Sequence, residues 1–203
     1  MSTVLLWTLV GFAAGSLPFS LWVGHLLAGK DIRRYGDGNP GAANAWRAGG
    51  WRVGLPALLL DYSKGAVPTA FAHFSVGLTG WELVPVALAP VAGHAFSPFL
   101  RFRGGKAVAA TFGAWTGLTL GEVPLILGLL LGAFVFVQDA DAWSLVAGML
   151  ALGAYLALVR HGPPPFLAVW AGHMAILLWK HAPDLRRGPR LRPWLARLLR
   201  RSR

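Results

Sequence analysis

The sequence predicts an all-α integral membrane protein, a bundle of about seven transmembrane helices with its N-terminus outside and its C-terminus in the cytoplasm. The first observation is composition, because 55% of the 203 residues are hydrophobic and only 13% are charged. The second is order, because long apolar runs alternate with short polar segments. The third is charge placement, because Lys and Arg gather in those polar segments.

Seven apolar runs are candidate spans, because each approaches the length that crosses a hydrocarbon core about 30 Å thick. They cover residues 3–28, 53–73, 83–100, 107–120, 123–138, 142–159 and 165–181. Pro18 predicts a kink in the first run, since proline lacks the backbone donor that a helix needs. Only Gly121 and Glu122 separate the fourth run from the fifth, which predicts a tight helical hairpin. The first run has no basic segment before it and continues past residue 20, so it reads as a span rather than a cleaved signal.

The basic residues orient the bundle, because cytoplasmic loops of membrane proteins carry an excess of Lys and Arg. With the N-terminus outside, the cytoplasmic segments are residues 29–52, 101–106, 139–141 and the tail from Lys180. These segments hold every Lys and Arg of the chain except Lys64 and Arg160. The first two segments then face one aqueous compartment, where they can form one site.

Two parts are predicted, a transmembrane domain over residues 1–185 and a basic amphipathic tail over residues 186–203. Apolar residues in the tail recur at helical spacing opposite arginines, and they are Leu191, Trp194, Leu195, Leu198 and Leu199. This pattern is typical of a helix that lies on anionic lipid. A disordered basic tail is the alternative.

The first candidate site is the polar loop at residues 35–47, which lies between two apolar runs. Its glycines, Gly36, Gly38 and Gly41, can take positive φ and turn successive backbone N–H groups toward one point, as phosphate sites do. The side-chain donors that it adds are Asn39, Asn44 and Arg47. Arg47 has a planar fork that suits two phosphate oxygens. An ordinary surface turn is the alternative, because the same residue types dominate turns.

The second candidate is Gly104-Gly105-Lys106, where two glycines precede a lysine at the start of an expected helix. Free N–H groups, a positive helix terminus and a mobile ammonium together suit a phosphate. The segment is not a Walker A loop, because that pattern's first glycine and its hydroxyl after the lysine are missing. A cluster that only sets topology, with Arg101 and Arg103, is the alternative.

Ionisable residues inside the spans form a third group. Asp61 and Lys64 share one helical face at i and i+3, where isolated charges are costly, so they are expected to pair. The pair either orients the helices or contacts a ligand. His94 and His173 each follow a glycine near the cytoplasmic half of a span, and a buried, hydrogen-bonded histidine is the alternative to a binding role.

Several function classes are excluded. The chain has no cysteine, hence no disulfide and no thiolate nucleophile. Its histidines and carboxylates lack metal-ligand spacing, and it has neither a Ser-His-Asp set nor a Gly-x-Ser-x-Gly elbow. The net charge of +11 does not indicate nucleic acid, because the basic residues lie between apolar runs. It favours membrane phospholipids or an anionic substrate as partners.

Blocks of residues in this order resemble a known family. They are residues 31–47, Asp61-Tyr-Ser-Lys-Gly65, Gly93-His-Ala-Phe96 and Phe102-Arg-Gly-Gly-Lys106. They are similar to the signature blocks of the bacterial acyl-phosphate:glycerol-3-phosphate acyltransferases, the PlsY family, and the resemblance covers nearly the whole chain. It implies transfer of a fatty acyl group from acyl phosphate to the 1-hydroxyl of glycerol 3-phosphate, giving lysophosphatidic acid for phospholipid synthesis. It also implies a multi-pass enzyme of the bacterial cytoplasmic (inner) membrane, without metal, cofactor or obligatory protein partner.

The resemblance also implies roles for residues. We expect Lys106, Arg47 and Asn44 to act in catalysis. We expect the substrate phosphate to be bound by Asn39, Gly41, Gly104, Gly105, His94 and His173. Asp37, Asp61 and Lys64 are left open. No side chain stands out as general base, and in the family a substrate phosphate is proposed to do that work. The acyl chain is expected near Phe96, Phe99, Phe102 and Trp46, with core packing as the alternative.

The chain departs from the family pattern in places. Asp37 replaces the usual serine and Ala43 the usual threonine, and a carboxylate repels phosphate unless it turns toward Arg33, Arg34 or Arg47. In the third block His173 is followed by Ile176 instead of asparagine, and Trp179 stands in place of a basic residue. The alternative function is therefore a non-catalytic or altered-substrate homologue that binds a phosphate-bearing ligand at the membrane. A transporter is disfavoured, because repeated halves are not seen.

Overall fold

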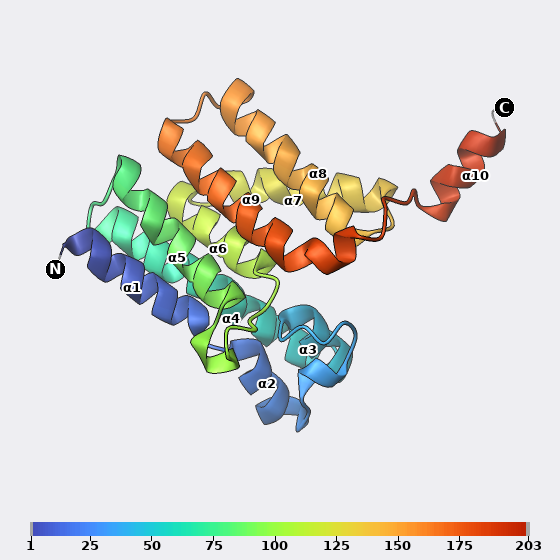
Figure 1. Cartoon of the computed structure of the whole chain (residues 1–203), viewed down its shortest axis with the longest axis horizontal. Coiled ribbons are helices and arrows are strands. Elements are labelled where there is room, and N and C mark those ends of the chain that lie inside the picture. The colour runs from blue at the N-terminus through green and yellow to red at the C-terminus, as the bar shows by residue number, and fades with distance from the viewer. Residues whose placement is uncertain (1, 202–203) are drawn as a thin grey trace.

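The computed structural model describes residues 2–201, and every regular element in that range is a helix (Figure 1). The helices are α1 (Thr3–Ser16), α2 (Phe19–Ala28), α3 (Ala42–Gly49), α4 (Trp51–Ala70), α5 (Leu83–Ala95), α6 (Val108–Thr119), α7 (Glu122–Val137), α8 (Asp141–Ala154), α9 (Pro164–Leu185) and α10 (Pro193–Arg201). The prediction of an all-α fold is confirmed.

Three helical stretches of the described chain are long and apolar enough to cross a membrane, namely Thr3–Ala28, Gly80–Leu100 and Asp141–Val159. Helix α7 is apolar but shorter. The remaining predicted spans coincide with α4, α6 and α9. Charged residues lower the hydropathy of α4 and α9, and α6 is only 12 residues long. The number of seven spans stays a prediction.

The first apolar run is broken rather than kinked. Helix α1 ends at Ser16, Leu17 is extended with φ −62° and ψ 125°, and α2 begins after Pro18. Proline cannot donate to the preceding turn and pushes the residue before it out of the helical region. Lys64 of α4 donates to the Leu17 carbonyl oxygen at 2.9 Å, which compensates the break.

Helices α4 and α6 approach each other closely through glycines. A Cβ atom at Gly65 would clash with the Ala110 carbonyl oxygen, and one at Gly113 would clash with that of Tyr62. Small residues at such contacts let two backbones touch, which is how membrane helices pack without a hydrophobic driving force between them. Helices α4 and α6 therefore form a tightly packed pair within the bundle.

Large apolar side chains cover the outside of the bundle. In α1, Leu5 and Leu9 are 47% and 51% exposed, and in α7, Leu125 and Leu129 are 64% and 63% exposed. Exposed apolar surface of this extent is a liability in water and is normal where lipid covers it. The inner layer is packed around Trp115, which is fully buried and stacks edge-on against Phe166.

The polar segments meet at one end of the bundle, where the α5–α6 loop, the loop before α3 and the end of α9 are in contact. The start of the tail is tied to the α7–α8 loop and to the first turn of α8. The Asp139 amide donates to the Arg190 carbonyl at 2.8 Å, and the Trp143 indole donates to that of Arg187 at 2.8 Å. Helix α10 then projects away from the bundle (Figure 1).

The tail helix begins at Pro193, eight residues after the end of α9 at Leu185. Of its predicted apolar face, Leu191, Trp194 and Leu198 are 49%, 37% and 61% exposed. The side chain of Leu199, also predicted to lie on this face, is outside the described part of the chain.

Candidate active site

The loop before α3 folds back on itself at two glycines. Gly36 and Gly38 have φ of 57° and 76°, a region that favours glycine. A Cβ atom at Gly36 would also clash with Asn44 Oδ1. Gly41 differs, because its backbone is extended with φ −122°, and it caps the start of α3. The turn brings Asp37 and Asn39 over the first residues of α3.

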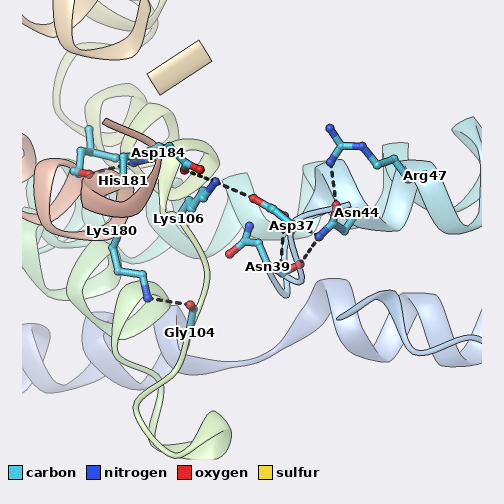
Figure 2. A network of polar contacts seen from close by, with 10 residues as sticks. Asp37, Asn39, Asn44, Arg47, Gly104, Lys106, Lys180, His181 and Asp184 are labelled. Carbon is cyan, nitrogen blue, oxygen red and sulfur yellow. Dashed lines mark hydrogen bonds and ion pairs between the residues drawn. The ribbon is translucent and has the colours of Figure 1, made fainter. Parts of the chain in front are cut away.

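A chain of hydrogen bonds runs through this loop, and Figure 2 shows it. Asp37 Oδ1 accepts from Asn44 Nδ2 at 2.8 Å and from the Asn39 amide at 3.1 Å. Asn44 Nδ2 also donates to the Asn39 carbonyl at 2.9 Å. Asn44 is buried, and its Oδ1 accepts from Arg47 Nη1 at 2.7 Å. Asn44 therefore connects Arg47 to Asp37.

Lys106 sits between two carboxylates from distant parts of the chain. Its Nζ lies 2.6 Å from Asp37 Oδ2 and 2.6 Å from Asp184 Oδ2, at the end of α9 (Figure 2). Asp37 is thus paired with Lys106, and not with Arg33, Arg34 or Arg47, the partners that the sequence offered for its charge. We call this arrangement the Lys106 clamp.

The clamp fixes the charge of its members. Burial by itself raises the pKa of the Asp37 carboxyl, but the bonds from Lys106, the Asn39 amide and Asn44 together outweigh it and lower the pKa from 3.8 to about 2. Burial also lowers the pKa of Lys106, yet its bonds to Asp184 and Asp37 raise that pKa above 10.5. Both groups are therefore ionised at neutral pH.

The two glycines before Lys106 allow close packing against the end of α5. A Cβ atom at Gly104 would clash with the His94 carbonyl oxygen, and one at Gly105 would clash with His94 Nε2. The Gly105 amide donates to the His94 carbonyl at 3.0 Å, so it is not free for a phosphate as the sequence suggested. Lys180 of α9 donates to the Gly104 carbonyl at 2.8 Å and to that of Ala95 at 3.0 Å, which holds the loop from the other side.

A cavity of about 360 Å³ opens at the clamp. Its charged and amide-bearing side chains include Asp37, Asn39, Lys106, Lys180 and Asp184. Its apolar side chains are Phe96, Phe102, Trp179, Pro40 and Pro183. We call it the Lys106 cavity. It combines a cation, amide donors and an apolar rim, and can therefore hold a small anion that carries an apolar group.

Of the predicted site residues, Asn39, Gly104, Lys106 and Asp37 line this cavity. Asn44 and Arg47 are one and two hydrogen bonds away from Asp37. Gly41 lies at the start of α3 beside Asn39.

The charged pair inside the bundle lies apart from the cavity lining. Asp61 and Lys64 are buried and form an ion pair of 3.0 Å. Ser20 donates to Asp61 Oδ2 at 2.5 Å, and His94 Nδ1 lies 3.9 Å from Asp61 Oδ1. Because His94 also packs on Gly105, the pair supports the Lys106 loop indirectly.

His173 occupies the core. It is fully buried, its Nε2 donates to the Ala87 carbonyl at 3.1 Å, and its ring stands edge-on to Trp115. The structure does not bring it to the lining of the Lys106 cavity.

Two charged residues at the end of α9, Lys180 and Asp184, were missed as site residues. They are one helical turn apart, at i and i+4, and both line the cavity. The available signal for Asp184 was its place one helical turn after Lys180 at the end of an apolar run. The sequence interpretation instead assigned Lys180 to the basic tail and gave Asp184 no role.

Comparisons with known proteins point to one family of enzymes. A family model for glycerol-3-phosphate acyltransferase matches residues 5–189. The chain is 39% identical over 194 residues to glycerol-3-phosphate acyltransferase 1 of Thermotoga maritima, covering 88% of this chain and 94% of that protein. It is 37% identical over 191 residues to a glycerol-3-phosphate acyltransferase of Thermus thermophilus, covering 91% of this chain and 92% of that protein.

Two crystal structures share the fold. Both are of PlsY (YgiH), an integral membrane glycerol 3-phosphate acyltransferase, one in the glycerol 3-phosphate form and one in the lysophosphatidic acid form. Their TM-scores are 0.80 and 0.81, at 28% sequence identity and with 92% of this chain covered; the alignments span 92% and 91% of those chains.

Proposed function

The chain belongs to the glycerol-3-phosphate acyltransferase family, and from that premise we propose how its loops bind and position the substrates. The protein is an acyltransferase that acylates glycerol 3-phosphate and makes lysophosphatidic acid for phospholipid synthesis. The family and activity predicted from the sequence are confirmed. The rival predictions, a transporter and a non-catalytic homologue, are not supported.

We propose acyl phosphate as the donor. In the reaction the 1-hydroxyl oxygen of glycerol 3-phosphate forms a bond to the acyl carbonyl carbon, and the bond from that carbon to the phosphate oxygen breaks. The hydroxyl proton goes to a phosphate oxygen, and inorganic phosphate leaves. An acyl phosphate is already activated, so the protein mainly has to position the two substrates and neutralise their phosphates.

The observation that carries the binding proposal is the Lys106 clamp. Two carboxylates hold the Lys106 ammonium, each at 2.6 Å, at the mouth of a cavity of about 360 Å³. Together they present two negative charges to one cation, as one phosphate dianion does. We infer that the phosphate of glycerol 3-phosphate takes the place of at least one of them on Lys106, with Asn39 and Lys180 nearby as donors.

The remaining predicted residues receive supporting roles in this proposal. Arg47 and Asn44 keep the first loop folded so that Asp37 and Asn39 face Lys106. His94, Gly104 and Gly105 fix the loop that carries Lys106. The acyl chain enters along the apolar rim, where Phe96, Phe102 and Trp179 lie.

The proposed function is tested with purified protein, palmitoyl phosphate and labelled glycerol 3-phosphate. Loss of one charge-assisted contact in a partly dehydrated site costs about 2 to 4 kcal/mol, so Lys106→Ala should lower kcat/KM roughly 30-fold to 1000-fold. Arg47→Ala should lower it less, because Arg47 acts through Asn44. Arg52→Ala, at an exposed arginine outside the network, is the matched control and should be neutral. An unchanged kcat/KM in Lys106→Ala would refute the assignment of this cavity as the active site.

We propose that the seven predicted spans cross the bacterial inner membrane with the N-terminus outside and the C-terminus in the cytoplasm. The contacts of Lys106 with Asp37 and Asp184 support one shared side for the basic loops. The ion pair of Arg160 with Glu122, at 2.7 Å, lies at the other end of α6. Arg160, the basic residue assigned to the outside, therefore has its carboxylate partner there.

Single cysteines in this cysteine-free chain test the topology. Cysteine at Asp37 or Arg103 should be labelled only from the cytoplasm, and cysteine at His161 should be labelled from outside. A cysteine at Ser202 is predicted to behave like Asp37, although Ser202 lies outside the described residues. Labelling of Arg103→Cys in intact cells by an impermeant reagent would overturn the orientation.

A further inference from the structure

A second cavity lies beside the Lys106 cavity and has a different charge. Its volume is about 520 Å³, and its lining includes Arg33, Arg101, Arg103, Phe99 and Leu100. The two cavities share Gly38, Pro40 and Arg103, so one wall separates them. Within the described residues no carboxylate lines the second cavity, whereas two carboxylates neutralise Lys106 in the first. An anion is therefore attracted to the second cavity, where Arg33 is paired with Asp31 but Arg101 and Arg103 have no carboxylate beside them in the lining.

The arginines of the second cavity are held on anchored turns. Arg33 is fixed by Asp31, whose Oδ2 accepts from its Nη2 at 2.7 Å. Arg101 has φ of 51° on a tight turn, and the Arg103 amide closes that turn on the Leu100 carbonyl at 2.9 Å. The turn is tied to the end of α1, since buried Ser97 donates to the Ser16 carbonyl at 2.5 Å. The cationic groups thus approach the cavity from two fixed segments.

The apolar part of the lining points to the kind of anion. Phe99 is 63% exposed although it lines this cavity together with arginines. A free inorganic anion gains nothing from such a ring, whereas a ligand with a hydrocarbon part next to its charge gains from burying both. Arginine forks match the oxygens of a phosphate.

We propose that the second cavity binds the phosphate group of an amphiphile, with Arg101 and Arg103 on the phosphate and Phe99 on the first carbons of the chain. Such a ligand comes either from the anionic phospholipids of the membrane or from the phosphate-bearing lipids of the reaction. The proposal goes beyond the acylation site and stands whether or not Lys106 binds glycerol 3-phosphate.

The test is binding of dodecyl phosphate to the purified full-length chain in phosphatidylcholine nanodiscs, measured by calorimetry and corrected with empty nanodiscs. Arg101→Gln should weaken the Kd about tenfold, as expected for one charge-assisted contact. Arg34→Gln, at an exposed arginine that lines neither cavity, is the matched control and should change the Kd less than twofold. Arg101→Lys, which keeps the charge but not the fork, should be intermediate, and it replaces the first variant should Arg101→Gln fail to fold.

Three binding measurements decide whether the second cavity is separate from the Lys106 cavity and whether its ligand is an amphiphile. Saturating glycerol 3-phosphate should not displace dodecyl phosphate, and Lys106→Ala should still bind it. Phe99→Ser should raise the Kd for dodecyl phosphate several-fold and leave the Kd for inorganic phosphate unchanged. Equal effects of Arg101→Gln and Arg34→Gln, or loss of binding in Lys106→Ala, would overturn the second site. Equal affinity of the protein for inorganic phosphate and for dodecyl phosphate would contradict the proposal that the ligand is an amphiphile.

The source of the ligand is found by competition. If phosphatidylglycerol in the nanodisc competes with dodecyl phosphate, the site takes membrane phospholipid. If only palmitoyl phosphate or lysophosphatidic acid competes, the site takes a lipid of the reaction. Both results support an amphiphile phosphate, and competition by neither contradicts it.

Discussion

Asp37→Asn tests whether the Lys106 clamp competes with substrate. The change keeps the size of the side chain and an Oδ1 atom that accepts from Asn44 and the Asn39 amide. It removes the negative charge that lies 2.6 Å from Lys106 Nζ. The first loop therefore stays folded while Lys106 loses one of its two carboxylate partners. Glycerol 3-phosphate then binds without having to break that ion pair.

The expected size of the effect follows from exposure. The side chains of Asp37 and Lys106 are 39% and 27% exposed, so solvent screens their ion pair. Such pairs contribute about 0.5 to 1 kcal/mol. This free energy corresponds to a KM for glycerol 3-phosphate that is about two- to fivefold lower in Asp37→Asn. The kcat should stay the same, because the ion pair is lost on binding and not in the chemical step.

Asp184→Asn is the matched variant, because its ion pair has the same 2.6 Å distance and its side chain is 38% exposed. Initial rates at saturating palmitoyl phosphate give KM and kcat for both variants, and thermal unfolding checks their folding. A KM that rises in Asp37→Asn but falls in Asp184→Asn would refute competition, and would mean that the charge of Asp37 positions the loop instead. Asp37→Ser, which restores the family's usual residue, also removes the acceptor of Asn44. The KM for glycerol 3-phosphate should therefore fall less in Asp37→Ser than in Asp37→Asn.

Three further predictions concern other parts of the molecule. Deleting residues 190–203 should reduce expression or lipid dependence more than turnover, because the tail helix carries arginines beside exposed apolar residues; a hundredfold loss of turnover per folded molecule would place the tail in the site. Lys180→Met should destabilise the protein by about 1 to 3 kcal/mol and raise the KM for glycerol 3-phosphate, because the Gly104 and Ala95 carbonyls lose a charged donor; unchanged thermal unfolding would contradict this. The pKa of Asp37 is about 2 in the folded protein and 3.8 otherwise, so its ionised form stabilises the fold above pH 3.8, and this contribution is lost as the pH falls through 2. The gap in melting temperature between wild type and Asp37→Asn, followed by tryptophan fluorescence, should therefore be constant above pH 4 and close toward pH 2, and a constant gap down to pH 2 would argue against the ion pair.

Local signals in the sequence were sufficient for the helices of the apolar runs and for the meeting of the two glycine-containing loops. They were not sufficient for α3 (Ala42–Gly49), which begins inside the segment predicted to be a loop. Apolar run length predicts a helix in each run, and the distribution of Lys and Arg predicts that residues 29–52 and 101–106 lie on one side. The break at Pro18 was underestimated, because only the fold shows that Lys64 satisfies the freed Leu17 carbonyl. Proline can either kink a helix or end it, and the local sequence does not decide between the two.

The partner of Asp37 could not be predicted, because it depends on tertiary packing. Arg33, Arg34 and Arg47 lie close to Asp37 in the sequence, whereas Lys106 is 69 residues away, yet the fold pairs Asp37 with Lys106. Asp184 of α9 holds Lys106 from the other side. The glycines before Lys106 also had two readings, as phosphate binders or as packing residues. The contact of Gly105 with the His94 ring favours packing, and this contact joins residues from opposite ends of the loop.

The break between α1 and α2 divides the first apolar run into two arms that have different packing partners. Helix α1 packs mainly on α5, whereas α2 packs on α3 and α4. The Lys64 bond to Leu17 holds the joint itself to α4. A bilayer that is thicker or thinner than the bundle changes the tilt of its outer helices. We expect Leu17 and Pro18 to take up part of such a tilt of α1 before it reaches α2 and the loop with Asp37 that follows it.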